Sequence, residues 1–315
     1  MEQHGKSEQR GTQAEVQGHG AQTSEGAGKL YVVATPIGNL GDISVRALTV
    51  LAQADLVAAE DTRTTGHLLA HHGIRAKLIA LHEHNEMQRA AELVARIQAG
   101  KTIALVSDAG TPGISDPGAL LVARAREAGI TVCPVPGANA AITALSAAGL
   151  PAPHFLFYGF LPAKSAARRT ELEALRELPY TLVFYEAPHR VTECVAALTE
   201  VLGAEREIVI ARELTKLFET IYRCPLGEAG AWLAADANRQ RGEFVLVVSG
   251  AQAPLQQGLP AEAERVLTLL LAELPLKQSA ALAAAITGAR KNELYARALA
   301  LRAPGGRSPG VSSDQ

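Results

Sequence analysis

The sequence predicts an α/β fold: two α/β domains followed by a small module of helices. Three observations predict it. From Lys29 to about residue 149, apolar strand-like runs alternate with helix-like runs. After residue 150 the pattern changes, and some strand-like runs follow one another without a helix between them. Residues 260–303 show helical periodicity only.

The N-terminal domain is expected at residues 29–149 as a parallel sheet. Its strand-like runs are apolar almost without interruption, which is typical of parallel strands buried on both faces. The expected strands are 29–36, 55–61, 77–82, 101–108 and 131–136, and the expected helices are 43–54, 62–73, 86–100, 118–129 and 139–149.

The C-terminal domain is expected at residues 150–252 as an α+β domain. A helix is expected after each of the first two strands, but none between 207–213 and 218–226, so these two runs predict a hairpin. A hairpin beside crossover connections makes the sheet mixed. The expected strands are 155–162, 181–187, 207–213, 218–226 and 243–250.

Residues 260–303 predict the helical module. Two of its helices, joined by "TGARK", resemble a helix-turn-helix. The segments 1–28 and 304–315 are rich in polar residues and Gly, with few large apolar side chains, so both are expected to be disordered tails.

Composition limits the possible functions. The formal net charge of −2 gives no global signal for nucleic-acid binding. No apolar run is long enough to span a bilayer or to serve as a secretory signal. The three cysteines form no CxxC pair, which favours reduced core thiols. A cytoplasmic protein without a membrane partner is therefore expected.

Polar or Gly/Pro-rich loops follow the strands of the N-terminal domain, at the edge where parallel sheets bind ligands. None carries the G-x-G-x-x-G or Walker spacing that binds a dinucleotide or nucleotide phosphate. The longest, "SDAGTPGISDPG" at 107–118, contains two Asp and no Lys or Arg. Such a loop favours a ligand with hydroxyl groups, an amino group or a positive charge. The loops are 35–42, 60–66, 82–86, 107–118 and 137–141.

A family resemblance covers residues 29–303. The segments "VVATPIGNLGDIS", "AAEDTRTTGHLL", "LVSDAGTPGISDPG", "PVPGANAAITALSAAGLP", "FYEAPHR" and "ARELTKLFETI" resemble, in this order, those of the tetrapyrrole-methylase family, in particular its members that modify small-subunit ribosomal RNA. The resemblance implies a homodimer that binds S-adenosylmethionine in a cleft between its two α/β domains. It also implies 2′-O-methylation of a cytidine ribose in the decoding region of 16S rRNA, within an assembled or nearly assembled 30S subunit.

The same resemblance implies the residues that bind the cofactor. The loops of the N-terminal domain would supply most of them, and two segments of the C-terminal domain would cover the ligand. These residues are Pro36, Ile37, Gly38, Asn39, Asp108, Ala109, Gly110, Gly113, Ile114, Ser115, Pro136, Gly137, Ala138, Asn139, Tyr185, Glu186, Glu243 and Phe244. No metal is expected.

A ribose hydroxyl is a weak nucleophile, so a nearby base or hydrogen-bond acceptor would assist its methylation. Candidates by residue type are Glu60, Asp61, His84, Glu186 and His189. Asp61 alternatively caps the following helix. Arg63 completes the catalytic set, either by binding RNA phosphate or by pairing with Asp61. His82 and His84 have the spacing of a metal pair, but no third ligand is evident.

Basic residues outside the loops also allow two interpretations. The three that follow the 155–162 strand either bind RNA phosphates or lie on a solvated helix face. The one at 216 has a structural or cleft-wall role or contacts RNA, and the four in the helical module either contact RNA or belong to a module that only packs. These basic residues are Lys164, Arg168, Arg169, Lys216, Lys277, Arg290, Lys291 and Arg297. Two rival functions remain open: methylation of a corrin or siroheme precursor, and a non-catalytic role in RNA assembly.

Overall fold

The computed structural model describes residues 28–151, 153–251 and 259–302. Its N-terminal sheet is parallel, with strand order β3-β2-β4-β1-β5. The elements are β1 (Lys29–Val33), η1 (Leu40–Asp42), α1 (Val45–Gln53), β2 (Leu56–Ala59), α2 (Thr62–His71), β3 (Leu78–Ala80), α3 (Glu86–Gln98), β4 (Ile103–Val106), α4 (Ala119–Glu127), β5 (Thr131–Val135) and α5 (Ala140–Ala147).

Helices cover both faces of this sheet, as the continuous apolar strands predicted. Successive strand residues point to opposite faces. On one face, Leu30, Ile103 and Leu105 pack in a cluster with side chains of α3 and α4. On the other face, Val33 and Val57 belong to a cluster that contains side chains of α1 and α2. The expected parallel sheet is therefore confirmed.

The second sheet is mixed, with strand order β6-β7-β10-β8-β9. Only β6 and β7 are parallel, while the other neighbours are antiparallel, and β8 and β9 form the expected hairpin. The elements are β6 (Phe155–Phe160), α6 (Ser165–Leu175), β7 (Thr181–Glu186), α7 (Val191–Leu202), β8 (Glu207–Arg212), β9 (Thr220–Pro225), α8 (Leu226–Ala234), η2 (Ala237–Gln240) and β10 (Phe244–Val248).

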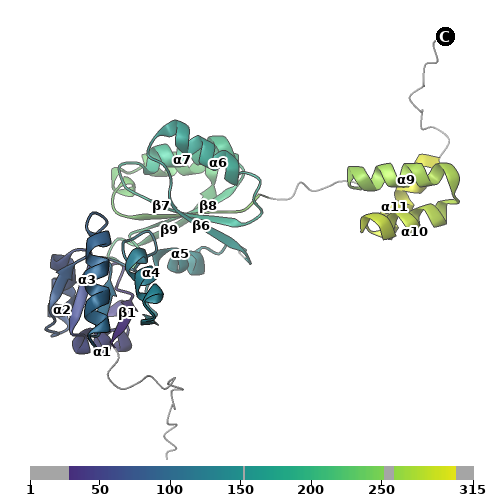
Figure 1. The fold of residues 1–315 in the computed structure, drawn as a ribbon. Helices are drawn as coiled ribbons and strands as arrows, with labels where there is room; N and C mark the ends of the chain where they lie inside the picture. The colour runs from purple at the N-terminus through teal and green to yellow at the C-terminus, as the bar shows by residue number, and fades with distance from the viewer. Residues whose placement is uncertain (1–27, 152, 252–258, 303–315) are drawn as a thin grey trace, which may run out of the picture. The chain divides into compact units, whose positions relative to one another are not determined.

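Helix α5 precedes the second sheet in sequence but packs against it. Ala141 and Ala144 share a buried cluster with Val183, Val209 and Val247. In Figure 1, α6 and α7 lie on the opposite face of that sheet from α5. Small alanines let the α5 backbone approach the strands closely. Both sheets belong to one compact unit. Helix α5, although it was assigned to the domain at residues 29–149, forms part of the core of the second sheet.

The helical part forms its own compact unit. It contains α9 (Ala261–Glu273), α10 (Leu276–Thr287) and α11 (Lys291–Arg302). Leu267, Ala280, Ala283 and Leu294 are fully buried in one cluster contributed by all three helices. Gly288, in the left-handed conformation, ends α10 and starts the predicted turn into α11.

Helix α8 and the short η2 were not predicted, because "LGEAGAWLA" follows β9 directly and lacks a capping side chain at its start. The expected tails 1–28 and 304–315 lie outside the described residues, except for Gly28. Within the described ranges, no helix combines the length and apolar character that crossing a membrane requires.

Candidate active site

The loop between β4 and α4 has an unusual backbone. Gly110, Gly113 and Gly118 have positive φ angles of 81°, 79° and 121°, and Ser115 adopts φ 64°. Glycine adopts such angles without strain, but a serine does so at a cost of about 1 kcal/mol or more. Strain of this kind persists only where the surroundings fix the backbone.

Contacts from three directions fix this loop. Gly110 and Thr35, which follows β1, exchange backbone hydrogen bonds of 2.8 and 3.1 Å. The Thr111 hydroxyl donates to the Ala138 carbonyl at 3.2 Å. Glu86, at the start of α3, accepts from the amides of Gly118, Leu120 and Leu121 at 2.9, 3.0 and 3.3 Å. The Glu86 carboxylate therefore caps the N-terminus of α4, a role that the side chain of the residue just before a helix usually fills.

A cavity of about 390 Å³ lies beside the loop, a size typical of small-molecule sites. The loops of the first sheet and the strands of the second both contribute to its wall. Apolar side chains such as Ile37, Leu214 and Phe244 stand beside polar groups. The lining residues are Ile37, Ala109, Gly110, Thr111, Ile114, Ser115, Asp116, Asn139, Ala140, Phe160, Tyr185, Glu186, Ala187, Pro188, Leu214, Glu243, Phe244 and Val245.

The structure brings together many residues that the sequence assigned to the cofactor. Those that line the cavity are Ile37, Ala109, Gly110, Ile114, Ser115, Asn139, Tyr185, Glu186, Glu243 and Phe244. Those that do not line it are Pro36, Gly38, Asn39, Asp108, Gly113, Pro136, Gly137 and Ala138. One of them, Gly137, is closely packed: a Cβ there would lie 2.9 Å from the Cβ of Ala34.

Sequence reasoning missed other lining residues: Thr111, Asp116, Ala140, Phe160, Ala187, Pro188, Leu214 and Val245. Asp116 lies in the quoted loop and was visible as an acidic residue beside glycines. Leu214 carried no such signal, because only the β8–β9 hairpin places this loop residue against the first domain's loops. Phe160 lies on β6, where Gly159, at φ 83°, approaches the Ser115 hydroxyl.

Of the expected catalytic set, only Glu186 lines the cavity. Glu60 and Asp61 lie next to Asp108: the Glu60 carboxylate accepts from the Asp108 amide at 3.2 Å, and Asp108 accepts from the Asp61 amide at 3.0 Å. Burial raises the pKa of Glu60 and of Asp108, and neighbouring carboxylates raise both further. These residues join the carboxyl ends of β2 and β4.

Asp61 and Arg63 form a pair at the start of α2. Asp61 accepts from the Arg63 amide at 2.7 Å, which caps the helix, and its carboxylate lies 2.6 Å from the guanidinium. The Arg63 hydrogen bonds lower the pKa of Asp61 to about 2. In the structure, Asp61 thus caps α2 and Arg63 pairs with Asp61. The rest of the Arg63 side chain is exposed to solvent.

None of the candidate histidines lines the cavity. The rings of His82 and His84 are 6.0 Å apart, and the His82 ring and backbone amide contact Asn85. His189 is exposed at the turn before α7. Within the described residues, no three His, Cys, Asp or Glu side chains are grouped as metal ligands.

Glu186 is buried at the end of β7 and meets a cation. Its carboxylate accepts from the Ala187 amide at 2.8 Å and lies 3.3 Å from the Arg190 guanidinium. Arg190 also donates to the Leu161 carbonyl at 2.5 Å. Burial, and then the neighbouring Glu186, raises the pKa of the Cys194 thiol. Glu186 is therefore held in place by several neighbours.

Arg168 corrects an expectation. Its side chain is 3% exposed and pairs with Glu193 at 3.2 Å, so it belongs neither to a solvated face nor to an open RNA-binding surface. Leu172 and Leu175, further along α6, are buried as well. Arg169, its neighbour in sequence, instead pairs with Glu200 near the surface.

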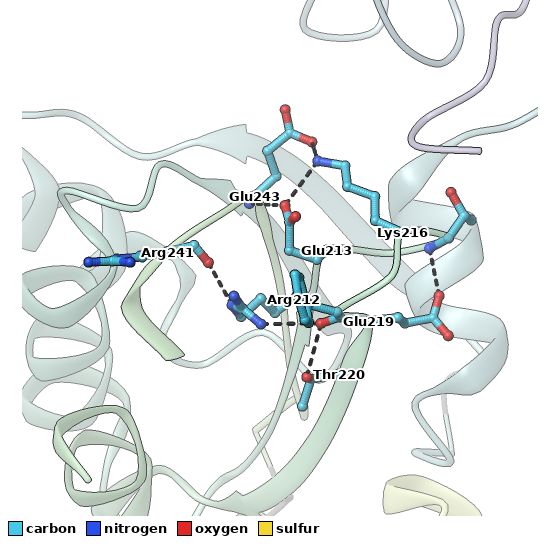
Figure 2. A network of polar contacts seen from close by, with 9 residues as sticks. Arg212, Glu213, Lys216, Glu219, Thr220, Arg241 and Glu243 are labelled. Carbon is cyan, nitrogen blue, oxygen red and sulfur yellow. Dashed lines mark hydrogen bonds and ion pairs between the residues drawn. The ribbon is translucent and has the colours of Figure 1, made fainter. Parts of the chain in front are cut away.

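A network of polar contacts holds the β8–β9 loop against the cavity (Figure 2). Lys216 lies 2.9 Å from Glu213 and 2.8 Å from Glu243, a cavity residue. Arg212 donates to the carbonyls of Arg241 and Phe218 at 2.6 and 3.2 Å. The Lys216 ammonium thus forms ion pairs with two carboxylates of the protein itself, which agrees with a structural role in the cavity wall.

Comparison with known proteins agrees with this fold. The model of the tetrapyrrole (corrin/porphyrin) methylases matches residues 29–230. A second model, described as an RsmI C-terminal HTH domain, matches residues 257–302. The chain therefore belongs to the tetrapyrrole methylase family.

Within that family, similar curated proteins are named ribosomal RNA small subunit methyltransferase I. The one from Pseudomonas aeruginosa is 59% identical over 274 residues, covering 87% of this chain and 97% of the relative. The one from Escherichia coli O157:H7 is 58% identical over 272 residues, covering 86% and 95%.

Solved structures show the same fold at low identity. The methyltransferase CobJ gives a TM-score of 0.54 at 20% identity, with 71% of this chain and 95% of that chain covered. A uroporphyrin-III C-methyltransferase from Thermus thermophilus, complexed with S-adenyl homocysteine, gives 0.50 at 17% identity, with 70% and 97% covered.

Proposed function

We propose that this chain uses S-adenosylmethionine to methylate the 2′-hydroxyl of a cytidine ribose in the decoding region of 16S rRNA, in an assembled 30S subunit. The observation that carries the proposal is the similarity to small-subunit rRNA methyltransferases over nearly their whole length, helical module included. Such an enzyme works where ribosomal subunits are, in the cytoplasm.

The cavity fits S-adenosylmethionine by its chemistry. Among its lining residues there is no Lys or Arg, whereas Asp116, Glu186 and Glu243 carry carboxylates. A phosphate ligand would require cations, but S-adenosylmethionine carries a sulfonium, an ammonium and a carboxylate. Ile37, Leu214, Phe244 and Val245 give apolar surface for an adenine ring. The Gly110 backbone allows a ligand to approach closely.

The chain's own residues act mainly by positioning. When bound, S-adenosylmethionine supplies an activated methyl group. The strained 107–118 loop and the Lys216 network each fix part of the cavity wall, which would keep donor and acceptor aligned before reaction. Alignment of this kind contributes several kcal/mol to the lowering of a transfer barrier. The apolar wall also excludes water from the reacting groups.

The test is to incubate the purified protein with tritiated S-adenosylmethionine and 30S subunits that lack the modification. Naked 16S rRNA and 50S subunits serve as comparison acceptors. Label in one cytidine ribose of 30S particles, resistant to alkaline cleavage at that nucleotide, supports the proposal. Label only in a uroporphyrinogen or corrin acceptor supports the tetrapyrrole alternative. Cofactor binding without transfer to any acceptor supports the non-catalytic one.

We also propose that the chain forms a homodimer. The supporting observation is an apolar group on the β8–β9 hairpin: Leu217 is 90% exposed and Phe218 67% exposed. Large apolar side chains grouped at a surface mark interaction sites. Light scattering should give a dimer mass for the wild type and a monomer mass for a Leu217→Lys/Phe218→Lys variant. A dimer mass for the variant as well as for the wild type would show that Leu217 and Phe218 do not form the interface.

A further inference from the structure

The carboxylates that line the cavity differ in their counter-ions. Glu186 lies 3.3 Å from Arg190, and Glu243 lies 2.8 Å from Lys216. Asp116 forms no ion pair with any Lys, Arg or His of the described residues. Among the described carboxylates of the wall, Asp116 is therefore the one whose charge no cation neutralises.

The groups that face Asp116 come from three strand ends. Besides burial, the negative charges of Glu60, after β2, and of Asp108 raise the pKa of Asp116, while the Ser107 side chain, after β4, lowers it. From the second sheet, Tyr185 of β7 lies close enough to feel the Asp116 charge, while its hydroxyl oxygen accepts from the Ala141 amide at 3.2 Å. All the charged groups among these neighbours are negative.

This environment makes Asp116 a better proton acceptor than an ordinary aspartate. Burial, and then the charge of Glu60, raises the pKa of Asp116 to about 6. A carboxylate of this kind is ionised at neutral pH, yet it holds a proton more strongly than a solvated one does. General bases work best when their pKa lies near the pH at which the enzyme operates.

The other acidic candidates are less suited to accept a proton in the cavity. Asp61 pairs with Arg63, which lowers its pKa to about 2, and it does not line the cavity. Glu60 does not line the cavity either, and one of its oxygens already accepts from the Asp108 amide. In Glu186 one oxygen accepts from the Ala187 amide and lies 3.3 Å from the Arg190 guanidinium, so this carboxylate has the counter-ion that Asp116 lacks, and its other oxygen is buried without a hydrogen-bond partner.

We propose that Asp116 is the catalytic base that accepts the proton of the hydroxyl being methylated. The assignment rests on the proposed function, because it requires a hydroxyl acceptor. In the step, the hydroxyl oxygen forms a bond to the methyl carbon and the methyl–sulfur bond breaks. The electron pair of that bond stays on sulfur, which becomes a neutral thioether. The hydroxyl proton moves to a carboxylate oxygen of Asp116, which becomes a neutral acid.

The experiment compares wild type, Asp116→Asn and Asp116→Glu in single-turnover methyl transfer to unmodified 30S subunits between pH 5 and 8.5. The wild-type rate should rise with pH to a plateau, with a midpoint near 6. Asp116→Asn should lose about 100-fold or more of the plateau rate, together with the acidic limb. Asp116→Glu should restore part of the rate with a shifted midpoint. Asp55→Asn, at the opposite end of β2, is the matched control and should keep the wild-type profile.

A second readout separates catalysis from ligand binding and folding. Calorimetry should give an S-adenosylhomocysteine affinity for Asp116→Asn within about twofold of wild type, because this product lacks the sulfonium charge that the Asp116 carboxylate attracts. Any loss of S-adenosylmethionine affinity should be far smaller than the loss of rate. A fall in affinity that matches the fall in rate would assign Asp116 to cofactor binding and overturn the proposal, as would a normal pH profile in Asp116→Asn. If wild type binds the cofactor but labels no RNA, the proposed function fails, and this assignment fails with it.

Discussion

Gly38 lies where the loop after β1 meets the loop after β8, and there is no room for a side chain. A Cβ at this position would lie 2.5 Å from the Lys216 Cγ, 2.8 Å from the Leu214 carbonyl oxygen and 2.8 Å from the Thr215 hydroxyl. One of these atoms belongs to the backbone of a loop that Lys216 and Arg212 already hold. A single added methyl group at Gly38 would therefore displace the loop that carries Leu214, a residue of the cavity wall.

Gly38→Ala should push the β8–β9 loop away from the first sheet. We expect a loss of about 1–3 kcal/mol in the free energy of unfolding, as for other overpacked sites, and weaker S-adenosylmethionine binding. Urea unfolding followed by Trp232 fluorescence, together with calorimetry, measures both. Gly230→Ala is the matched control, because a Cβ there meets no atom within 4 Å and the residue is helical. Equal behaviour of the two variants would refute the packing argument.

Asp116 should also affect stability, with a sign that follows from its raised pKa. The folded state binds the proton more tightly than the unfolded state, so stability falls as pH rises from about 4 through 6. Asp116→Asn removes that cost. We expect it to stabilise the protein by about 1 kcal/mol at pH 8, after allowance for partial solvation of the charge, and by less at pH 5. Urea unfolding at the two pH values measures this difference. A destabilised variant at pH 8 would contradict the assigned environment.

At the scale of elements, α4 depends on a residue from another helix. Gly118 precedes α4 and offers no capping side chain, so the Glu86 carboxylate accepts from the first amides of α4. The same contact ties the start of α3 to the end of the 107–118 loop. The position of that loop is thus determined by two helices and by the Thr35–Gly110 bridge.

Glu86→Ala should leave these amides without an acceptor and cost about 1–2 kcal/mol of folding stability. The loop should loosen as well, so S-adenosylmethionine affinity should fall. Glu86→Gln keeps a carbonyl acceptor and should retain most of both. Hydrogen exchange at the amides of Leu120 and Leu121 reports the cap directly. Unchanged protection in Glu86→Ala would show that the cap does not hold α4.

At the scale of the whole molecule, the α/β unit and the helical unit each have a core of their own. The cavity is lined entirely by residues of the α/β unit, while Leu267 and Leu294 belong to a separate cluster in the helices. Because each unit has its own core, each is expected to fold without the other.

A chain ending at Ala251 should therefore fold and bind S-adenosylmethionine with an affinity within about twofold of the full chain. Its methylation of 30S subunits should fall by at least about tenfold if the helices supply 1.4 kcal/mol or more of binding. Calorimetry and the tritium assay measure the two effects. Exposed Arg290 is the first residue of the module to test by substitution. Full activity of the shortened chain would assign the module to another task.

The sequence predicted the order of elements well because apolar periodicity depends on local burial alone. It placed Ile37, Gly110 and Tyr185 at the ligand through motif resemblance, and the structure places these residues on the cavity wall. It could not distinguish Asp116 from Asp61, since both are acidic residues after strands. Only folding places Arg63 beside one and leaves the other facing carboxylates. Likewise, nothing local indicated that Arg168 would be buried.

The cavity wall comes from both sheets, so a ligand bound there fills space that would otherwise separate two halves of one unit. A ligand in that position would be packed between the two sheets much as core side chains are, but it could leave. Its binding free energy adds to the cohesion of the halves by mass action, about 2.7 kcal/mol at a hundred times the dissociation constant. The cell's supply of methyl donor would then set how long this molecule survives heat or proteolysis, as well as how fast it works.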